Sequence, residues 1–251
     1  MPGTRATTRN RPLKFAILKS EWLIGFRNRR LFFFNTIIPV VFVAPIILSD
    51  APAVHLTAII VVLFALFSTF GSSIPLVRDQ ESGLLQRYVM TGVNPGWLLI
   101  ERTVAFVALD FLQLVPAMFL IIFSSKSNAG IAPLFAVGVL LSLLAGNLVG
   151  VLAASIARSI AEGALFSSLF ALYMVHLAGV FRVAPPGSLF ATLEPWVPFR
   201  PLYISVRALV SGINPAENAE VMYPPLLVTL GLILAVYFWG QALFTSKETG
   251  S

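Results

Sequence analysis

The chain has 251 residues, of which 57% are hydrophobic and only 11% are charged. Soluble domains carry roughly 25% charged residues, so this composition excludes an ordinary soluble protein and indicates an integral membrane protein. Cysteine is absent, which excludes disulfides and thiolate chemistry, and the net charge of +6 gathers beside the first hydrophobic segment, where it is an orientation signal and not a nucleic-acid surface.

Six segments are long and apolar enough to cross a membrane, which takes about 20 mostly apolar residues. They are residues 31–48, 54–77, 97–123, 131–157, 164–181 and 225–244. The sequence therefore predicts an all-α, polytopic membrane protein in which residues 1–251 form a single transmembrane domain.

Lysine and arginine predict the orientation, because they favour the cytoplasmic side of a membrane. Eight of the 17 lie in residues 1–30, and the first external turn has none. With this segment inside, residues 78–96 and Arg158 are also cytoplasmic, and residues 182–224 are outside. We expect a multi-pass protein of the plasma membrane with both termini in the cytoplasm.

The N-terminal segment, within residues 1–30, has the pattern of an amphipathic helix. Its apolar stripe is Phe15, Leu18, Trp22 and Phe26, while Lys14, Glu21 and Arg29 fall elsewhere on the helix. Such a helix lies on the inner membrane surface with basic residues facing anionic lipid headgroups. Two roles stay open, namely a membrane anchor and a binding surface for a cytoplasmic partner.

The external segment at 182–224 contains seven prolines, which exclude one continuous helix. Within it, the stretch PLYISVRALVSG predicts a shorter helix. Its apolar face is Leu202, Val206, Leu209 and Val210. We expect an amphipathic helix or a re-entrant hairpin at the outer membrane surface, with its backbone sheltered by protein.

The loop RDQESGLLQRYVMTGVNP, which begins at Arg78, predicts a helix of about three turns between two spans. Its apolar face is Leu84, Leu85, Tyr88 and Val89. Gly92 and the Asn94–Pro95 pair stop the helix. A loop that only connected two spans would need no folded helix, whereas an apolar helix face presented to the cytoplasm suits a groove on another protein.

Several features resemble the type-2 ABC exporter permeases over most of the chain. The pattern E-x-G-x-L at Glu81, Gly83 and Leu85, followed by Arg87 and TGV at 91–93, resembles their coupling helix. The N-terminal helix, the six spans and the stretch PFRPLYISVRALVSG are similar to their connecting helix, topology and outer re-entrant region. The resemblance implies that the ATPase is contacted by Arg78, Asp79, Glu81, Gly83, Leu85, Arg87, Tyr88 and Thr91.

The ATP-binding motif G-x-x-x-x-G-K-[ST] does not occur in the sequence. The resemblance therefore implies that the chain is a transport subunit without enzymatic activity of its own. ATP and magnesium would bind to a separate ABC ATPase subunit, present in two copies. A second copy of the chain, or a homologous permease, would complete the transporter in the lipid membrane.

The fourth predicted span carries small residues at every fourth position. They are Gly138, Ser142, Gly146, Gly150 and Ala154. Small side chains let helix backbones approach closely in lipid. The stripe predicts either packing within one subunit or contact between two permeases.

Polar residues inside the spans are candidates for a substrate path, because such residues are costly in lipid and usually face the interior. They are Asp110, Gln113, Asn147 and His176. A purely structural role is the alternative for each. Glu101 and Arg102 lie near the inner end of their span, where we expect them to reach the interface by snorkelling.

We expect the transported molecule to be lipophilic or amphiphilic, such as a drug, an antibiotic or a lipid-like compound, because the cavity would be mostly apolar. Neither histidine has a partner at metal-ligand spacing, so no metal site is predicted. Two alternatives remain at this stage: an ion-coupled secondary transporter, and an intramembrane serine protease using the GSS stretch at 71–73 with His176 as base.

Overall fold

The computed structural model describes residues 16–49, 52–124, 129–211 and 222–244, and these described residues are helical without any strand. Among these residues, five helices are long and apolar enough to cross a membrane. They are α2 (Arg29–Leu48), α3 (Ala53–Glu81), α5 (Pro95–Ser124), α6 (Ala132–Ile156) and α7 (Ile160–Leu177). The all-α polytopic membrane fold is confirmed. The basic residues before Ala16, together with Lys126 and Lys247, lie outside the described residues.

The sixth predicted span is a shorter apolar helix, α10 (Tyr223–Trp239), followed by the 3₁₀ helix η5 (Gly240–Phe244). The helix α3 continues to Glu81, which is four residues beyond the end predicted at residue 77. The helix α7 begins earlier than predicted, because the Ser159 side chain caps it by accepting a 3.2 Å hydrogen bond from the Glu162 backbone N–H.

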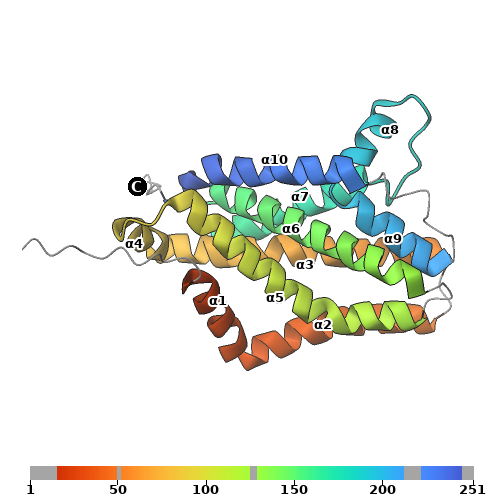
Figure 1. Cartoon of the computed structure of the whole chain (residues 1–251), viewed down its shortest axis with the longest axis horizontal. Helices are drawn as coiled ribbons and strands as arrows, with labels where there is room; N and C mark the ends of the chain where they lie inside the picture. The colour runs from red at the N-terminus through yellow and green to blue at the C-terminus, as the bar shows by residue number, and fades with distance from the viewer. Residues whose placement is uncertain (1–15, 50–51, 125–128, 212–221, 245–251) are drawn as a thin grey trace, which may run out of the picture.

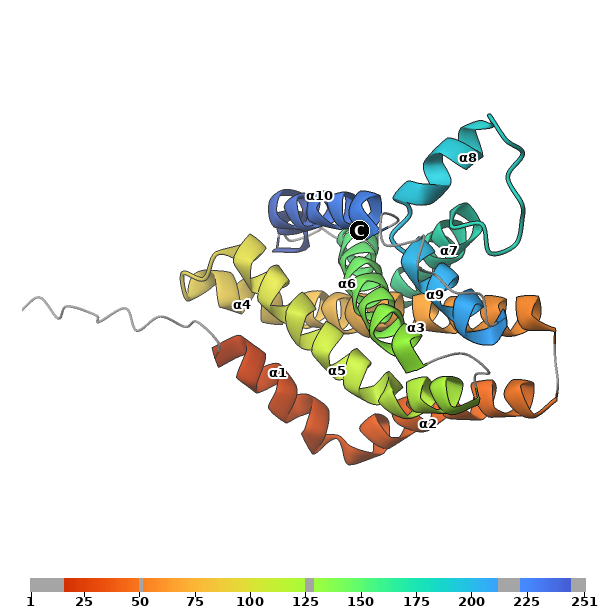
Figure 2. The same cartoon turned by 45° about the vertical axis from the view of Figure 1, so that its right-hand side comes forward.

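The long helices run side by side, and the short ones lie at the two ends of the bundle (Figure 1). One end holds α1 (Ala16–Arg27), α4 (Leu84–Met90) and η5. The opposite end holds α8 (Leu189–Leu193) and α9 (Arg200–Ser211), and the second view shows the same division (Figure 2). We call the first of these the α4 end.

The helix α6 runs through the middle of the bundle and is mostly buried, whereas α2 is mostly exposed. The small residues of α6 face other helices of this same chain. A Cβ at Gly146 would collide with the Ser68 hydroxyl of α3, and one at Gly150 would collide with the backbone carbonyl oxygen of Thr69. These glycines allow the backbones of α3 and α6 to approach closely.

The half of the small-residue stripe that lies farther from the α4 end packs against α9 and the turn before it. A Cβ at Gly138 would lie 3.2 Å from the backbone of Pro201, and the Ser142 hydroxyl donates a 3.3 Å hydrogen bond to the carbonyl oxygen of Pro198. Ala154, at the other end of the stripe, is also fully buried. All five small residues therefore pack against other parts of this same chain.

The helix predicted in the external segment is α9. Three of its four predicted apolar residues, Leu202, Val206 and Leu209, are almost completely buried. They belong to the same buried cluster as residues of α3 and α6. The apolar pattern thus identified the face that packs on the bundle.

Candidate functional site

The helix α4 is held between two glycines in left-handed backbone conformations. Gly83 has φ 70° and Gly92 has φ 81°, and a Cβ at either position would have no neighbour within 4 Å. The backbone conformation, and not lack of space, therefore requires glycine at both positions. The helix has two turns where three were predicted, because residues 78–81 belong to the end of α3.

One side of α4 is part of the protein core. Leu85 is fully buried in a cluster that also contains Leu76 of α3, Leu99 of α5 and Leu243 of η5. The prediction that Leu85 lies on an exposed apolar face is therefore wrong. The helix is too short for its apolar spacing to show which side faces inward.

Other apolar residues of α4 are exposed, and Met90, five positions after Leu85, lies on a different side of the helix from Leu85. Met90 is 84% exposed, and Leu84 and Val89 are each more than one-third exposed. Arg87 is exposed on the same short helix. We call these four residues the α4 surface. Sequence reasoning missed Met90, although an apolar residue directly before a Thr-Gly turn is a usable signal for an exposed tip.

Other residues assigned to the ATPase contact hold the loop itself together. The Thr91 hydroxyl donates a 2.7 Å hydrogen bond to the carbonyl oxygen of Tyr88 at the end of α4. The Glu81 carboxylate accepts a 3.2 Å hydrogen bond from the backbone N–H of Ile160, the first residue of α7. A carboxylate at that position is favoured by the helix dipole. Contact of these residues with an ATPase stays a prediction.

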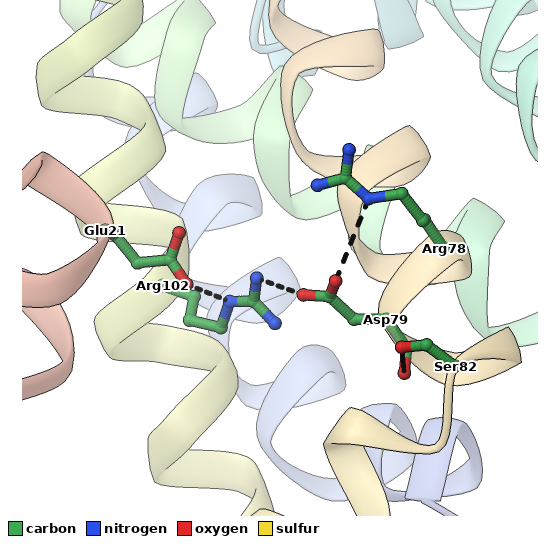
Figure 3. A network of polar contacts seen from close by, with 5 residues as sticks. All are labelled: Glu21, Arg78, Asp79, Ser82 and Arg102. Carbon is green, nitrogen blue, oxygen red and sulfur yellow. Dashed lines mark hydrogen bonds and ion pairs between the residues drawn. The ribbon is translucent and has the colours of Figure 1, made fainter. Parts of the chain in front are cut away.

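Behind α4, three buried charged residues from three helices form an ion network (Figure 3). The Arg102 Nε of α5 lies 2.9 Å from Glu21 Oε1 of α1, and Arg102 Nη2 lies 2.6 Å from Asp79 Oδ2 of α3. Their side chains are only 4% (Arg102), 12% (Glu21) and 11% (Asp79) exposed. The expectation that Arg102 snorkels to the interface is wrong, because its partners lie within the protein.

Arg78 is the outermost member of this network. Its Nε lies 3.9 Å from Asp79 Oδ1, and its side chain is 66% exposed. Arg78 therefore stays available on the surface next to α4, while Asp79 faces inward. Glu101, which precedes Arg102 in the sequence, accepts a 2.7 Å hydrogen bond through one carboxylate oxygen from the indole N–H of Trp97.

Glu21 is a buried member of the network and not part of a solvated helix face. Burial raises the pKa of its carboxyl above the ordinary value, and the Arg102 guanidinium opposes this rise. Next along the same face of α1, a Cβ at Gly25 would lie 3.0 Å from a methyl group of Leu109. The helix thus packs on α5 through its Glu21 and Gly25 side.

A second polar cluster lies deeper in the bundle, where α3, α5 and α6 meet. The Asn147 amide donates a 2.9 Å hydrogen bond to Asp110 Oδ2, and the Ser72 hydroxyl donates a 2.7 Å hydrogen bond to the Asn147 carbonyl oxygen. Gly71 of α3 lies directly against the Asp110 carboxylate. Asp110 and Asn147 are both buried, at 6% and 0% exposure.

The four residues predicted for a substrate path do not form one group. Gln113 is buried one turn after Asp110 on α5. His176 lies on an exposed side of α7, and no hydrogen bond joins its side chain to Asp110 or Asn147 in the described part of the chain. Within the described ranges, no group of three His, Asp or Glu side chains could hold a metal ion.

The fold and the α4 end together define the membrane domain of a transport protein: a helical bundle that crosses the membrane and carries a short helix on a loop at one end. A profile of the ABC-2 family transporter proteins matches residues 50–243, and the chain belongs to this family. No curated protein matches the chain. The matched range begins after α1 and α2, so Glu21 lies outside it.

Family membership confirms the resemblance seen in the sequence. The protein is a permease component of an ABC transporter, a class of transport subunit that associates with an ABC ATPase and has no catalytic activity of its own. This sets aside both an ion-coupled secondary transporter and an intramembrane protease.

Proposed function

We propose that the chain is the permease of an ATP-driven exporter, and that its ATPase subunit docks on the α4 surface. The observation that carries this proposal is Met90, an apolar side chain 84% exposed at the tip of a helix whose other side is anchored by the fully buried Leu85. An exposed apolar residue on a well-anchored helix is suited to fill a pocket on a partner.

The charge around α4 supports the same partner. Arg78 and Arg87 are both exposed beside Met90. The partner surface would then be an apolar pocket with acidic residues at its rim, since complementary charges steer association and fix register. In this proposal the α4 end and both termini are cytoplasmic. Two ATPase subunits bind ATP and magnesium, and a second permease copy or a homologous permease completes the exporter.

The proposed substrate is a lipophilic or amphiphilic small molecule. An apolar groove between α5 and α6 supports this choice. Its lining consists of Val104, Val107, Val137, Leu140, Leu141 and Leu144. The side chains of Ser72 and Asn147 bind the backbone or Asp110. The buried polar atoms of the spans that have no hydrogen-bond partner among the described residues include Ser73 Oγ, Gln113 Oε1, Asn147 Oδ1 and Ser167 Oγ, so a substrate would find only a small number of polar groups there. Asp110, Gln113, Asn147 and His176 stay proposed residues of the substrate path.

The test is to purify the tagged protein from membranes of cells that produce it naturally and to identify the bound ATPase by mass spectrometry. The substitution Met90→Asp should weaken ATPase binding by about 30-fold or more, because losing an apolar anchor typically costs about 2 kcal/mol. The matched control is Leu189→Asp, which changes another exposed apolar residue at the opposite end of the molecule.

The control should retain the ATPase at the wild-type level. Retention of the ATPase by Met90→Asp would move the docking site away from α4. Absence of any ATPase from the wild-type preparation would contradict the proposed function as a whole.

A further inference from the structure

The ion network at the α4 end joins three segments that are far apart in the sequence. Glu21 lies on α1, Asp79 in the last turns of α3 and Arg102 in the second turn of α5. We propose that Arg102 is a positioning residue that fastens α1 to the root of the α4 loop, so that α1 and α4 move together during transport. The inference rests on the proposed function, because the ATPase would act on α4.

The root of the loop is the place where Arg102 meets Asp79. Asp79 lies four residues before Gly83, and Arg102 lies seven residues after the start of α5. Their 2.6 Å contact therefore closes the loop at its base. A force on α4 reaches the bundle through the buried Leu85 and through the ends of α3 and α5, which Arg102 holds together.

The second contact of Arg102 brings α1 into the same unit. The helix α1 contacts α5 through Glu21 and Gly25, while Leu23 and Ile24 on its other side are more than half exposed. Its end leads through Asn28 directly into α2, the first membrane-spanning helix. The position of α1 therefore sets where the first span begins.

The ion network is better suited to fixing the positions of α1, α3 and α5 than to increasing the stability of the folded protein. Burying charges costs several kcal/mol per ion, and burial disfavours the ionised Glu21. The Arg102 guanidinium contacts both carboxylates at once, through a hydrogen bond from Nη2 to Asp79 and an ion pair between Nε and Glu21.

The variant that tests the inference is Glu21→Leu. It removes the contact to α1 but leaves Arg102 paired with Asp79, so no charge is left buried without a partner. Because Arg102 keeps Asp79 as its partner, this substitution should destabilise the protein less than the loss of Arg102 itself. The control is Lys19→Leu, which removes an exposed charge from the same helix.

The first measurement is the distance between spin labels on Leu23→Cys and Met90→Cys, with the protein alone in lipid vesicles. The native chain has no cysteine, so the labels attach at these two positions. The wild type and Lys19→Leu should give one narrow distance distribution, and Glu21→Leu should give a broad one. A distribution in Glu21→Leu that matches the wild type would overturn the inference.

The second measurement uses the unlabelled protein with its ATPase in vesicles. Glu21→Leu should bind the ATPase normally but transport about fivefold fewer molecules per ATP hydrolysed, a typical size for coupling between sites. A broad distance distribution with normal transport per ATP would also overturn the inference. If no ATPase binds the wild type, the proposed function fails, and with it the transport part of the inference. The distance measurement then decides the fastening of α1 alone.

Discussion

Two of the buried sites with ionisable residues in the described part of the chain differ in the partners that those residues have. At the α4 end, Arg102 lies between two carboxylates that belong to other helices. Deeper in the bundle, Asp110 has an amide partner, Asn147, and no ion pair to Asp110 occurs within the described ranges. At the α4 end, opposite charges join separate segments, whereas deeper in the bundle a hydrogen bond from a neutral amide to Asp110 lies inside an existing helix interface.

The two clusters also differ in how closely the backbone packs around them. Asp110 lies against Gly71, and next to it α3 and α6 approach too closely at Gly150 for a Cβ to fit. The α4 loop instead has Gly83 and Gly92 in open surroundings. Close packing fixes the deeper cluster, while at the α4 end the buried Leu85 and specific ion contacts hold a loop that begins and ends at left-handed glycines.

The largest effect expected from this comparison is that of Arg102→Leu. It would leave the carboxylates of Glu21 and Asp79 buried without their cation, which typically costs about 3–5 kcal/mol of stability. Thermal and denaturant unfolding of the purified protein would measure the loss. Arg87→Leu is the matched control, because Arg87 is exposed on α4 and its loss should change stability by about 0.5 kcal/mol or less. Equal stability of the two variants would break the comparison.

A smaller effect is expected of Asp110→Asn. The new side chain keeps an oxygen that accepts the hydrogen bond of Asn147, so the stability loss should be about 1 kcal/mol, the difference between a charged and a neutral hydrogen bond. A loss as large as that of Arg102→Leu would contradict the distinction drawn here.

The same Asp110→Asn variant sharpens the prediction for the substrate path. Export is measured per correctly inserted molecule, so that changes in protein level do not count. A changed rate or substrate range would support a role of Asp110 in the path, whereas unchanged normalised export would remove it.

Length and hydropathy were sufficient to predict the membrane-spanning helices. A run of about 20 apolar residues has few structural alternatives, so α2, α5 and α6 were located within a few residues. The small-residue stripe identified the face of α6 that packs closely, but the sequence did not indicate that the partners would be α3 and α9 of the same chain.

The contacts of individual polar residues could not be predicted. Glu21 and Arg102 are 81 positions apart and meet because α1 packs against α5, which no local pattern indicates. The two-turn α4 gave a similar difficulty, since Leu85 and Met90 are both apolar and only the folded protein shows that one is buried and the other exposed.

Docking of a cytoplasmic ATPase on α4 requires that the α4 end face the cytoplasm, and the accessibility of single cysteines tests this orientation most directly. Val183, 95% exposed at the opposite end, and Ser82, exposed just before α4, are each replaced by cysteine in the cysteine-free chain. A membrane-impermeant thiol reagent should label Val183→Cys in intact cells and Ser82→Cys only after the membrane is opened. Labelling of Ser82→Cys in intact cells, with Val183→Cys protected, would contradict the account, because a cytoplasmic ATPase could not reach α4.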